Sequence, residues 1–474
     1  MDSSEFKKLL SKRFPFDASD SQKFWLESIV DFLYTADENV LYLLKGYAGT
    51  GKSTLLGHLV KILHKANYKA VLMAPTGRAA KVIANYSGKK AFTIHKQIYF
   101  TRTEKGSGVQ FVLKPNKYRN TLFIVDEASM IGDDRQNAKL FENGSLLDDL
   151  MQYVDAGTNC KLLLVGDPAQ LPPVHLSISP ALDGKYLENK FNKTVTEWEL
   201  KEVVRQQKDS GILGNATQLR RQMDEEDFDS FSFDLTVACD VQRLQDGNEI
   251  FELLDDALRN GGLEETVFIV RSNKRANLYN QQIRGRILFL EADLSVGDQL
   301  MVVKNNYFWL EAESDPSFIA NGDLVKVLRI FSHHELYDFK FAKVEVQLVD
   351  YPDEKPFETV LLLDTLSSES PSLTYEEGNQ LYLAVQEDYQ HLSTKYKRFL
   401  AVKNNPYFNA LQVKYSYAIT CHKSQGGQWK NVFIEQPYLP DGPDLSYFRW
   451  LYTALTRAQT NLYLVGFKDD FFKK

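Results

Sequence analysis

The stretch "GYAGTGKST", residues 46–54, decides the fold of this chain of 474 residues. It fits the pattern G-x-x-x-x-G-K-[ST], in which glycines let backbone N–H groups point inward around the phosphates of a nucleotide. Lys52 places a positive charge near the β- and γ-phosphates, and the hydroxyl group of Ser53 is suited to bind Mg²⁺. The sequence therefore predicts a nucleotide-binding loop, formed by Gly46, Ala48, Gly49, Thr50, Gly51, Lys52, Ser53 and Thr54.

The residues around this loop predict a parallel β-sheet between helices. Four apolar runs are continuous rather than alternating, at residues 39–46, 69–75, 120–130 and 160–170. Strands that are apolar on both faces are typical of parallel sheets with helices on both sides. Each run ends in polar residues, and open α/β sheets bind their ligands at the carboxyl ends of the strands. Residues 22–34 predict an amphipathic helix ahead of the sheet.

Polar side chains at two of these strand ends indicate the chemistry of the site. Asp126 and Glu127 directly follow an apolar run. One carboxylate in this position can hold Mg²⁺, and the second can orient or deprotonate an attacking water molecule. A base that activates water suits hydrolysis better than transfer to a small acceptor. Gln170 follows another apolar run and could reach a γ-phosphate, with an ordinary turn as the alternative interpretation of this stretch.

The rest of the chain predicts three further units. Residues 98–116 contain two β-prone halves around a Gly-Ser-Gly turn, which predicts a β-hairpin. A second α/β set is predicted in three pieces, at residues 265–287, 413–437 and 461–467. Between them, residues 295–412 hold short strands separated by glycine or aspartate turns, followed by a charged helical segment at 374–400. This pattern predicts a small β-barrel inserted in the second α/β domain.

The composition is typical of a globular protein, with 43% hydrophobic and 25% charged residues. The net charge of −7 argues against a simple basic nucleic-acid-binding module, but it is compatible with a local basic channel. No run approaches the ~20 apolar residues that span a bilayer, and the three cysteines are far apart without a zinc pattern. We therefore expect a soluble cytoplasmic protein without a membrane partner, and a monomer, because nothing marks an oligomer interface.

Eight stretches occur in an order that resembles the motifs of superfamily 1 DNA helicases. They are "GYAGTGKST", "APTGRAAK", "TIHK", "VDEAS", "GDPAQLPPV", "VVRQ", "YAITCHKSQG" and "YTALTRA". The pattern is most similar to the 5′→3′ branch that includes the RecD and Dda enzymes, and the likeness covers nearly the whole chain. The resemblance implies an enzyme that uses ATP and Mg²⁺, translocates 5′→3′ on single-stranded DNA, and unwinds DNA at junctions between single strand and duplex.

The same resemblance implies an α/β fold with two RecA-like P-loop NTPase domains, each built on a parallel sheet. The first domain would comprise residues 1–210 and carry the hairpin 98–116 as a strand-separating pin. The second domain would comprise residues 211–294 and 413–474. Residues 295–412 would form an inserted SH3-like β-barrel plus the helical segment. An arginine of the second domain would complete the ATP site, so that hydrolysis is coupled to domain closure.

The matching motifs also imply roles for individual residues. Gln22 matches the glutamine that recognises adenine, and Gln425 and Gly426 match positions near the nucleotide. The implied catalytic residues are Lys52, Glu127, Gln170, Arg205 and Arg457, with Ser53 and Asp126 as the ligands of Mg²⁺. The two arginines would stabilise the charge that develops on the γ-phosphate. The implied DNA contacts are Thr76, Arg78, His95, Lys96, Thr420, His422 and Lys423, and the pin would stack Tyr99, Phe100 or Phe111 on the first base pair.

Alternatives to these roles stay open at the level of sequence. Thr76 can cap a helix, His95 can be a hydrogen-bonded core residue, and the hairpin aromatics can be ordinary strand residues. A translocase that strips proteins from single strands without strong unwinding fits the same motor motifs. A P-loop kinase is disfavoured, because a kinase does not need a second α/β set with its own arginine motif. A GTPase is disfavoured because the guanine-reading pattern N-K-x-D is absent.

Overall fold

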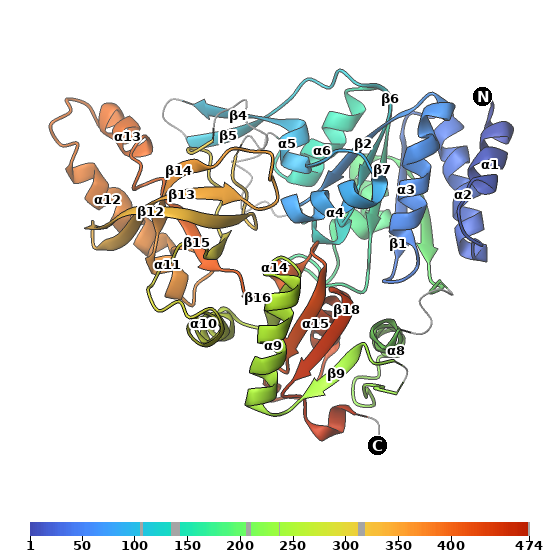
Figure 1. Cartoon of the computed structure of the whole chain (residues 1–474). Coiled ribbons are helices and arrows are strands. Elements are labelled where there is room, and N and C mark those ends of the chain that lie inside the picture. The colour runs from blue at the N-terminus through green and yellow to red at the C-terminus, as the bar shows by residue number, and fades with distance from the viewer. Residues whose placement is uncertain (105–107, 134–142, 205–209, 237, 311–317, 473–474) are drawn as a thin grey trace.

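The computed structural model describes residues 1–104, 108–133, 143–204, 210–236, 238–310 and 318–472, and for 101–104 and 108–111 it describes the backbone alone. Figure 1 shows three regions: a first parallel sheet with its helices at upper right, a β-barrel with two helices at left, and a second parallel sheet below. The N-terminus lies with the first sheet and the C-terminus with the second. Within these ranges, no helix has the length and apolar character needed to cross a membrane.

The first sheet has six parallel strands in the order β3-β2-β6-β7-β1-β8. Their bounds are β1 Val40–Gly46, β2 Lys69–Ala74, β3 Ala91–Thr93, β6 Arg119–Val125, β7 Thr158–Gly166 and β8 Thr194–Leu200. The four strands predicted from apolar runs, β1, β2, β6 and β7, occupy the centre, where helices cover both faces. The sequence does not predict the edge strands β3 and β8, because β3 has three residues and β8, "TVTEWEL", carries polar residues among its apolar ones.

Helices cover this sheet, namely α1 Ser3–Lys12, α2 Asp20–Tyr34, α3 Lys52–Ile62, α4 Gly77–Ser87, α5 Ile94–Ile98, α6 Leu146–Asp155 and α7 Gly184–Phe191. The helix predicted at 22–34 is therefore α2. It starts with a capping box, in which Ser19 and Gln22 satisfy each other's backbone N–H groups. Helix α3 follows the phosphate loop without a break, so its N-terminal amides face that loop.

The hairpin predicted at 98–116 is confirmed. Strands β4, Tyr99–Glu104, and β5, Gly108–Leu113, pair antiparallel from Tyr99 opposite Leu113 to Glu104 opposite Gly108. The hairpin follows α5 directly, and Figure 1 shows that it extends from the first sheet toward the barrel. It is a separate two-stranded sheet, so it forms an arm on the first α/β region rather than a part of its core.

The second sheet has five parallel strands in the order β16-β10-β17-β18-β9. Their bounds are β9 Val241–Leu244, β10 Thr266–Val270, β16 Ala418–Thr420, β17 Trp429–Glu435 and β18 Ala458–Val465. Its helices are α8 Gly211–Glu225, α9 Gly247–Gly261, α10 Asn273–Gln282, α14 Cys421–Ser424 and α15 Leu445–Leu455. All three predicted pieces of the second α/β set contribute strands to this sheet, so the chain leaves it after α10 and returns at β16.

The chain between α10 and β16 forms a closed five-stranded barrel, as predicted. Its strands are β11 Gln299–Val302, β12 Leu324–Leu336, β13 Phe339–Leu348, β14 Phe357–Leu362 and β15 Leu411–Tyr415. Because β15 closes the barrel, the barrel extends to Tyr415, three residues beyond the expected boundary. The charged segment at 374–400 forms two helices, α12 Tyr375–Glu387 and α13 Lys395–Lys403, after the short α11 Asp364–Ser367. Apolar residues of α12 and α13 pack against β13 and β14, which braces that side of the barrel.

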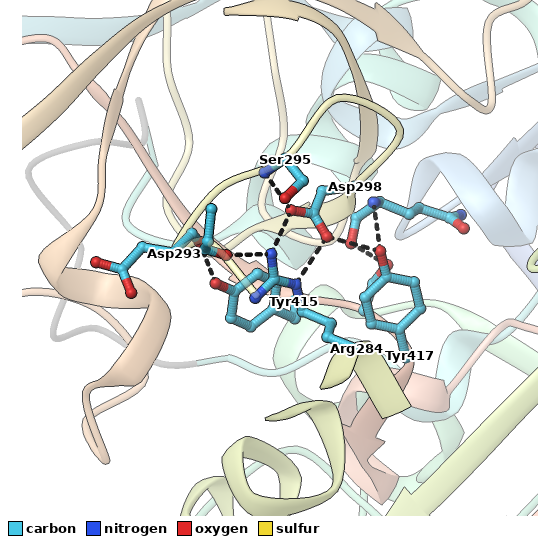
Figure 2. A network of polar contacts seen from close by, with 9 residues as sticks. Arg284, Asp293, Ser295, Asp298, Tyr415 and Tyr417 are labelled. Atoms are coloured by element: carbon cyan, nitrogen blue, oxygen red, sulfur yellow. Dashed lines mark hydrogen bonds and ion pairs between the residues drawn. The ribbon is translucent and has the colours of Figure 1, made fainter. Parts of the chain in front are cut away.

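A buried ion pair joins the barrel to the second α/β region (Figure 2). Arg284, in the π-helical turn Ile283–Ile287 that continues α10, pairs with Asp298 through two hydrogen bonds of 2.9 Å. Tyr417 donates to the same carboxylate at 2.9 Å, and the Arg284 guanidinium lies 4.4 Å from the ring of Tyr415. Asp298 lies where the chain enters the barrel, and Tyr415 and Tyr417 lie where it leaves. This network therefore fixes the barrel to the second α/β region at its point of insertion.

Candidate active site

The phosphate loop has the backbone geometry that its glycines predict. Gly49 and Gly51 have φ angles of +77° and +85°, which side-chain-bearing residues rarely adopt. Gly51 is the N-cap of α3, so the loop ends at the positive end of a helix dipole. The Nζ atom of Lys52 donates to the carbonyl oxygens of Gly46 and of Tyr47, the latter at 2.9 Å. Its charge is thereby held over the loop.

Gln22 lies against this loop, as its expected role requires. Its Nε2 atom donates to the backbone oxygen of Thr50 at 3.0 Å, while its Oε1 atom accepts from Ser19 at 3.1 Å. The side chain is 3% exposed, and a Cβ atom on Gly51 would lie only 2.6 Å from its Nε2 atom. The glycine is therefore required for the close approach of the glutamine as well as for the turn.

The two predicted carboxylates lie side by side after β6. Tyr86 of α4 donates to Asp126 at 2.8 Å, and the backbone N–H of Glu127 donates to the other Asp126 oxygen at 2.9 Å. Glu127 has left-handed backbone angles, φ 55° and ψ 38°, which cost a non-glycine residue of order 1–3 kcal/mol and are concentrated at functional sites. Burial raises the pKa of the Glu127 carboxyl, and the nearby positive charge of Arg457 opposes that rise.

Arg457 brings the second α/β region to this carboxylate. It is 3% exposed and donates to backbone oxygens of Thr453 and Gly427 at 2.9 and 3.2 Å. Gln170 of the first region is 7% exposed, and its Oε1 atom has no hydrogen-bond partner among the described residues. A buried amide oxygen without a partner is costly, so this atom is positioned for a ligand or water. Arg205, the other predicted arginine, lies outside the described residues.

Two residues that the sequence analysis does not single out, Tyr452 and Asp167, complete the connection between the regions. The Tyr452 hydroxyl of α15 accepts from the backbone N–H of Ala48 at 2.9 Å and donates to Asp167 at 2.8 Å. Thr453 accepts from the Leu171 backbone at 2.8 Å. Both new residues lie inside the quoted stretches "YTALTRA" and "GDPAQLPPV", but residue type alone does not distinguish them from core residues.

The expected DNA contacts of the first region lie around the start of α4 and on α5. Thr76 accepts from the Ala79 backbone at 3.2 Å, so it does cap α4. The Arg78 guanidinium lies 4.4 Å over the ring of Trp429, and this contact joins the two α/β regions. Burial lowers the pKa of His95 to about 4 and that of Lys96 to about 8, so His95 is neutral at pH 7.

The barrel also approaches the start of α4. A Cβ atom on Gly77 would lie 2.9 Å from an oxygen of Asp323, and Asp350 is 3.5 Å from Lys81. A cavity of about 250 Å³ remains between α4, Lys90, Lys96 and the barrel loop that carries Asp350. Basic side chains of the first region and acidic side chains of the barrel therefore share one cleft.

The expected DNA contacts of the second region are on and next to α14. Thr420 is its N-cap residue, His422 is exposed, and Lys423 donates to Asn321 of the barrel. Burial lowers the pKa of Lys423 to about 8. Gln425, expected near the nucleotide, donates to the Leu171 backbone at 2.7 Å, and a Cβ atom on Gly426 would lie 3.2 Å from the Thr76 hydroxyl oxygen. Both residues therefore lie where the two α/β regions meet.

The structure separates the three aromatic residues predicted for the pin. Tyr99 is 3% exposed and its hydroxyl donates to Asp149 at 2.7 Å, so it cannot stack on a base pair from this position and the expectation for it is corrected. Phe100, its neighbour on the other face of β4, is 55% exposed. Alternation along a strand explains the difference, because successive side chains point to opposite faces. The Phe111 side chain lies outside the described residues.

Two domain models and several known proteins are similar to this chain. A model of an AAA domain matches residues 31–234, and a model of the UvrD-like helicase C-terminal domain matches residues 415–465. The ATP-dependent DNA helicase Dda of Enterobacteria phage T4 is 23% identical, over 89% of this chain and 93% of its own. The ATP-dependent RecD2 DNA helicase of Deinococcus radiodurans is 36% identical, over 28% of this chain and 16% of its own.

Among solved structures, a Pif1 helicase from Bacteroides in complex with ADP-AlF3 and single-stranded DNA matches 97% of this chain and 95% of its own, with 15% identity and a TM-score of 0.45. The two domain models match separate segments, one over most of the first α/β region and one over β16 to β18 and α15. The helicases Dda and RecD2 are similar to this chain in sequence, over 89% and 28% of its length. In its domain models and in these two relatives, the chain is therefore similar to ATP-dependent DNA helicases of the RecD and Dda type.

Proposed function

We propose that this protein is an ATP-dependent DNA helicase that translocates 5′→3′ on single-stranded DNA and unwinds duplex DNA ahead of it. One observation carries the proposal: the second α/β region reaches the phosphate loop of the first, where the Tyr452 hydroxyl accepts from the Ala48 backbone at 2.9 Å and donates to Asp167 at 2.8 Å. An ATPase centre that needs both regions can convert hydrolysis into their relative motion. The relatives Dda and RecD2, both named as ATP-dependent DNA helicases, support the substrate class.

The residues present fit ATP and Mg²⁺. The loop from Gly46 to Thr54 offers helix N-terminal amides and the Lys52 charge to the phosphates, and Gln22 lies beside the loop for adenine. Ser53 and Asp126 would hold Mg²⁺, which neutralises charge on the phosphate oxygens when bound. Glu127 would accept a proton from the attacking water, and Gln170, with its unpartnered Oε1 atom, would orient that water. Arg457 and Arg205 would stabilise the charge that develops on the γ-phosphate.

The DNA strand would cross both α/β regions beneath the barrel. Lys96 lines the cleft between α4 and the barrel, Thr76 caps the start of α4, and Lys423 of α14 donates to Asn321 of the barrel. Contacts from such residues to the DNA backbone carry no sequence code. Arg78, His95, Thr420 and His422 complete the proposed set. The hairpin β4–β5 would act as the pin, with Phe100 as its described exposed aromatic residue.

The proposal includes the coarser properties expected from composition. We infer a monomeric motor, located in the cytoplasm, with the pin, the first domain 1–210, the second domain and the inserted barrel as its parts. The described cysteines Cys160, Cys239 and Cys421 are free thiols, which supports a reducing compartment. Single-stranded DNA and its junctions with duplex DNA are the proposed partners.

The test is ATP-dependent strand separation of one duplex with a 5′ single-stranded tail, compared with the same duplex with a 3′ tail. We expect only the 5′-tailed duplex to open. Opening of the 3′-tailed duplex alone would overturn the proposed polarity, but the proposed helicase activity would stand. If neither opens and single strands still stimulate hydrolysis, the protein is a translocase without strong unwinding.

A further inference from the structure

Tyr452 connects the two α/β regions through its side chain. It belongs to α15 of the second region, and its hydroxyl group reaches into the first region, where it contacts the phosphate loop at Ala48 and the carboxylate of Asp167. The side chain is 1% exposed. One oxygen atom therefore accepts a hydrogen bond from the nucleotide-binding loop and donates one to the strand end that carries Gln170.

The neighbouring contacts connect this tyrosine to the expected DNA-binding helix. Leu171, four residues after Asp167, donates its backbone N–H to Thr453 at 2.8 Å and accepts from Gln425 at 2.7 Å through its carbonyl oxygen. Thr453 follows Tyr452, and Gln425 follows directly after α14, which carries His422 and Lys423. The segment from Asp167 to Leu171 is thus held at both ends by the second region.

We propose that the Tyr452 hydroxyl is a positioning group of the ATPase centre, which couples occupancy of α14 by DNA to the geometry of the phosphate loop. The proposal rests on the helicase function proposed above, because α14 binds DNA only if that function is correct. Movement of α14 shifts Gln425 and the Asp167–Leu171 segment, and Tyr452 transmits the position of α15 to Ala48. Removal of the hydroxyl leaves the Ala48 N–H group and the Oδ2 atom of Asp167 without their shared partner, while the Oδ1 atom of Asp167 still accepts from the Ala169 backbone at 2.9 Å. Polar atoms that lose a hydrogen-bond partner are costly, so the effect is large for a single atom.

The test compares Tyr452→Phe with Tyr447→Phe. Tyr447 is a matched control because it is on the same helix, is fully buried, and donates one hydrogen bond, to Gln436 at 2.9 Å, away from the phosphate loop. The measurement is kcat and KM for ATP, with and without single-stranded DNA. For Tyr452→Phe we expect the stimulation of kcat by DNA to fall about tenfold, with KM for ATP changed less than about threefold, which corresponds to ~1.4 kcal/mol in the activated state.

Three results would overturn the proposal. Stimulation at the wild-type level in Tyr452→Phe shows that the hydroxyl does not transmit the effect of DNA. An equal loss in Tyr447→Phe shows that both substitutions merely disturb α15. A rise of KM for ATP alone, with stimulation intact, also contradicts it, because the hydroxyl then only shapes the loop for ground-state binding.

A double-mutant cycle separates this proposal from the helicase function itself. Tyr452→Phe and Asp167→Asn weaken the same hydrogen bond, so their effects on kcat should be clearly less than additive, whereas Tyr447→Phe and Asp167→Asn should be additive. The cycle uses whatever hydrolysis the wild-type protein shows. If DNA does not stimulate the wild type, the helicase proposal fails, and additivity of Tyr452→Phe with Asp167→Asn then rejects the positioning role as well. If the cycle is non-additive although DNA does not stimulate the wild type, the hydrogen bond between Tyr452 and Asp167 still positions the ATPase centre, independently of DNA.

Discussion

Gln425 and Leu171 belong to different α/β regions, yet the side-chain amide of Gln425 donates a 2.7 Å hydrogen bond to the Leu171 backbone. Gln425 follows the expected DNA-binding helix α14, and Leu171 follows Gln170 of the ATPase centre. The proposed nucleotide-binding and DNA-binding residues of this protein are therefore separated by few covalent and hydrogen-bonded steps. The predictions below test the separate parts of that arrangement.

Lys52→Ala should reduce kcat for ATP hydrolysis at least about hundredfold, because the phosphates lose the charge that the loop holds over its carbonyl oxygens. Lys45→Ala is the control, since Lys45 is also close to the loop but forms an ion pair with Glu197 at 2.6 Å. It should retain hydrolysis. Substantial turnover by Lys52→Ala would mean that the loop does not hold the hydrolysed phosphate.

The pH dependence of hydrolysis should report on Glu127. Burial raises its pKa, and the carboxylate accepts a proton only when it is ionised. Activity of the wild type should therefore fall on the acid side at a pH above the ordinary glutamate value of about 4.3. Arg457→Ala removes a charge that lowers this pKa, so the acid limb should move to higher pH, in addition to a loss of about 10³-fold in kcat.

The measurement for this prediction is kcat as a function of pH for the wild type, Arg457→Ala and Arg449→Ala. Arg449 lies on α15, just ahead of Arg457 in the chain, but its side chain donates to the Ser177 backbone. Arg449→Ala should leave the acid limb in place. An acid limb that stays unchanged in Arg457→Ala would show that the base does not sense this arginine.

Phe100→Ala should lower the rate of duplex unwinding about tenfold while DNA-stimulated hydrolysis is retained, because one stacking surface is worth ~1–3 kcal/mol. Phe331→Ala is a matched control. Phe331 is 47% exposed with a lysine Nζ at 5.7 Å, and Phe100 is 55% exposed with a lysine Nζ at 5.5 Å. If unwinding and hydrolysis fall together in Phe100→Ala, the hairpin is a structural element and not a wedge.

Lys423→Ala should weaken binding of single-stranded DNA and reduce the slope of log K against log salt by about 1, as expected for one lost phosphate contact. The comparison is Lys430→Ala, whose lysine is exposed and paired with Glu265 at 3.4 Å. Fluorescence titrations at several salt concentrations give both slopes. An unchanged slope for Lys423→Ala would show that Lys423 of α14 does not contact a phosphate of the DNA strand.

Arg284→Met should lower the free energy of unfolding by ~3–5 kcal/mol, because it leaves the Asp298 carboxylate, which is fully buried, without its cationic partner. Arg329→Met breaks an exposed pair with Glu345 on the barrel and should cost at most about 1 kcal/mol. Urea unfolding of both variants checks this difference. Similar small losses in both would show that the network of Figure 2 does not hold the barrel in place.

The site residues that local patterns predict lie in short, contiguous stretches of the sequence. The loop around Lys52 and the pair Asp126–Glu127 follow apolar runs, and local backbone chemistry fixes their position at strand ends. The resemblance to helicase motifs added Gln22 and Arg457, which no local pattern distinguishes from surface residues. Tyr99 shows the limit of this approach, since a hairpin is predictable from its turn while the buried face of its first strand depends on what packs beneath it.

By itself, the sequence determined the central strands of both sheets, the hairpin, the barrel and the phosphate loop, because each depends on hydrophobic runs or glycine geometry within about ten residues. The tertiary structure alone decided the edge strands β3 and β8, the closure of the barrel by β15, and the meeting of Tyr452 with Ala48 and Asp167. The Tyr452 contacts join residues that are 404 and 285 positions apart. The geometry of these contacts depends on how the two α/β regions pack against each other, and no local pattern of side chains determines that packing.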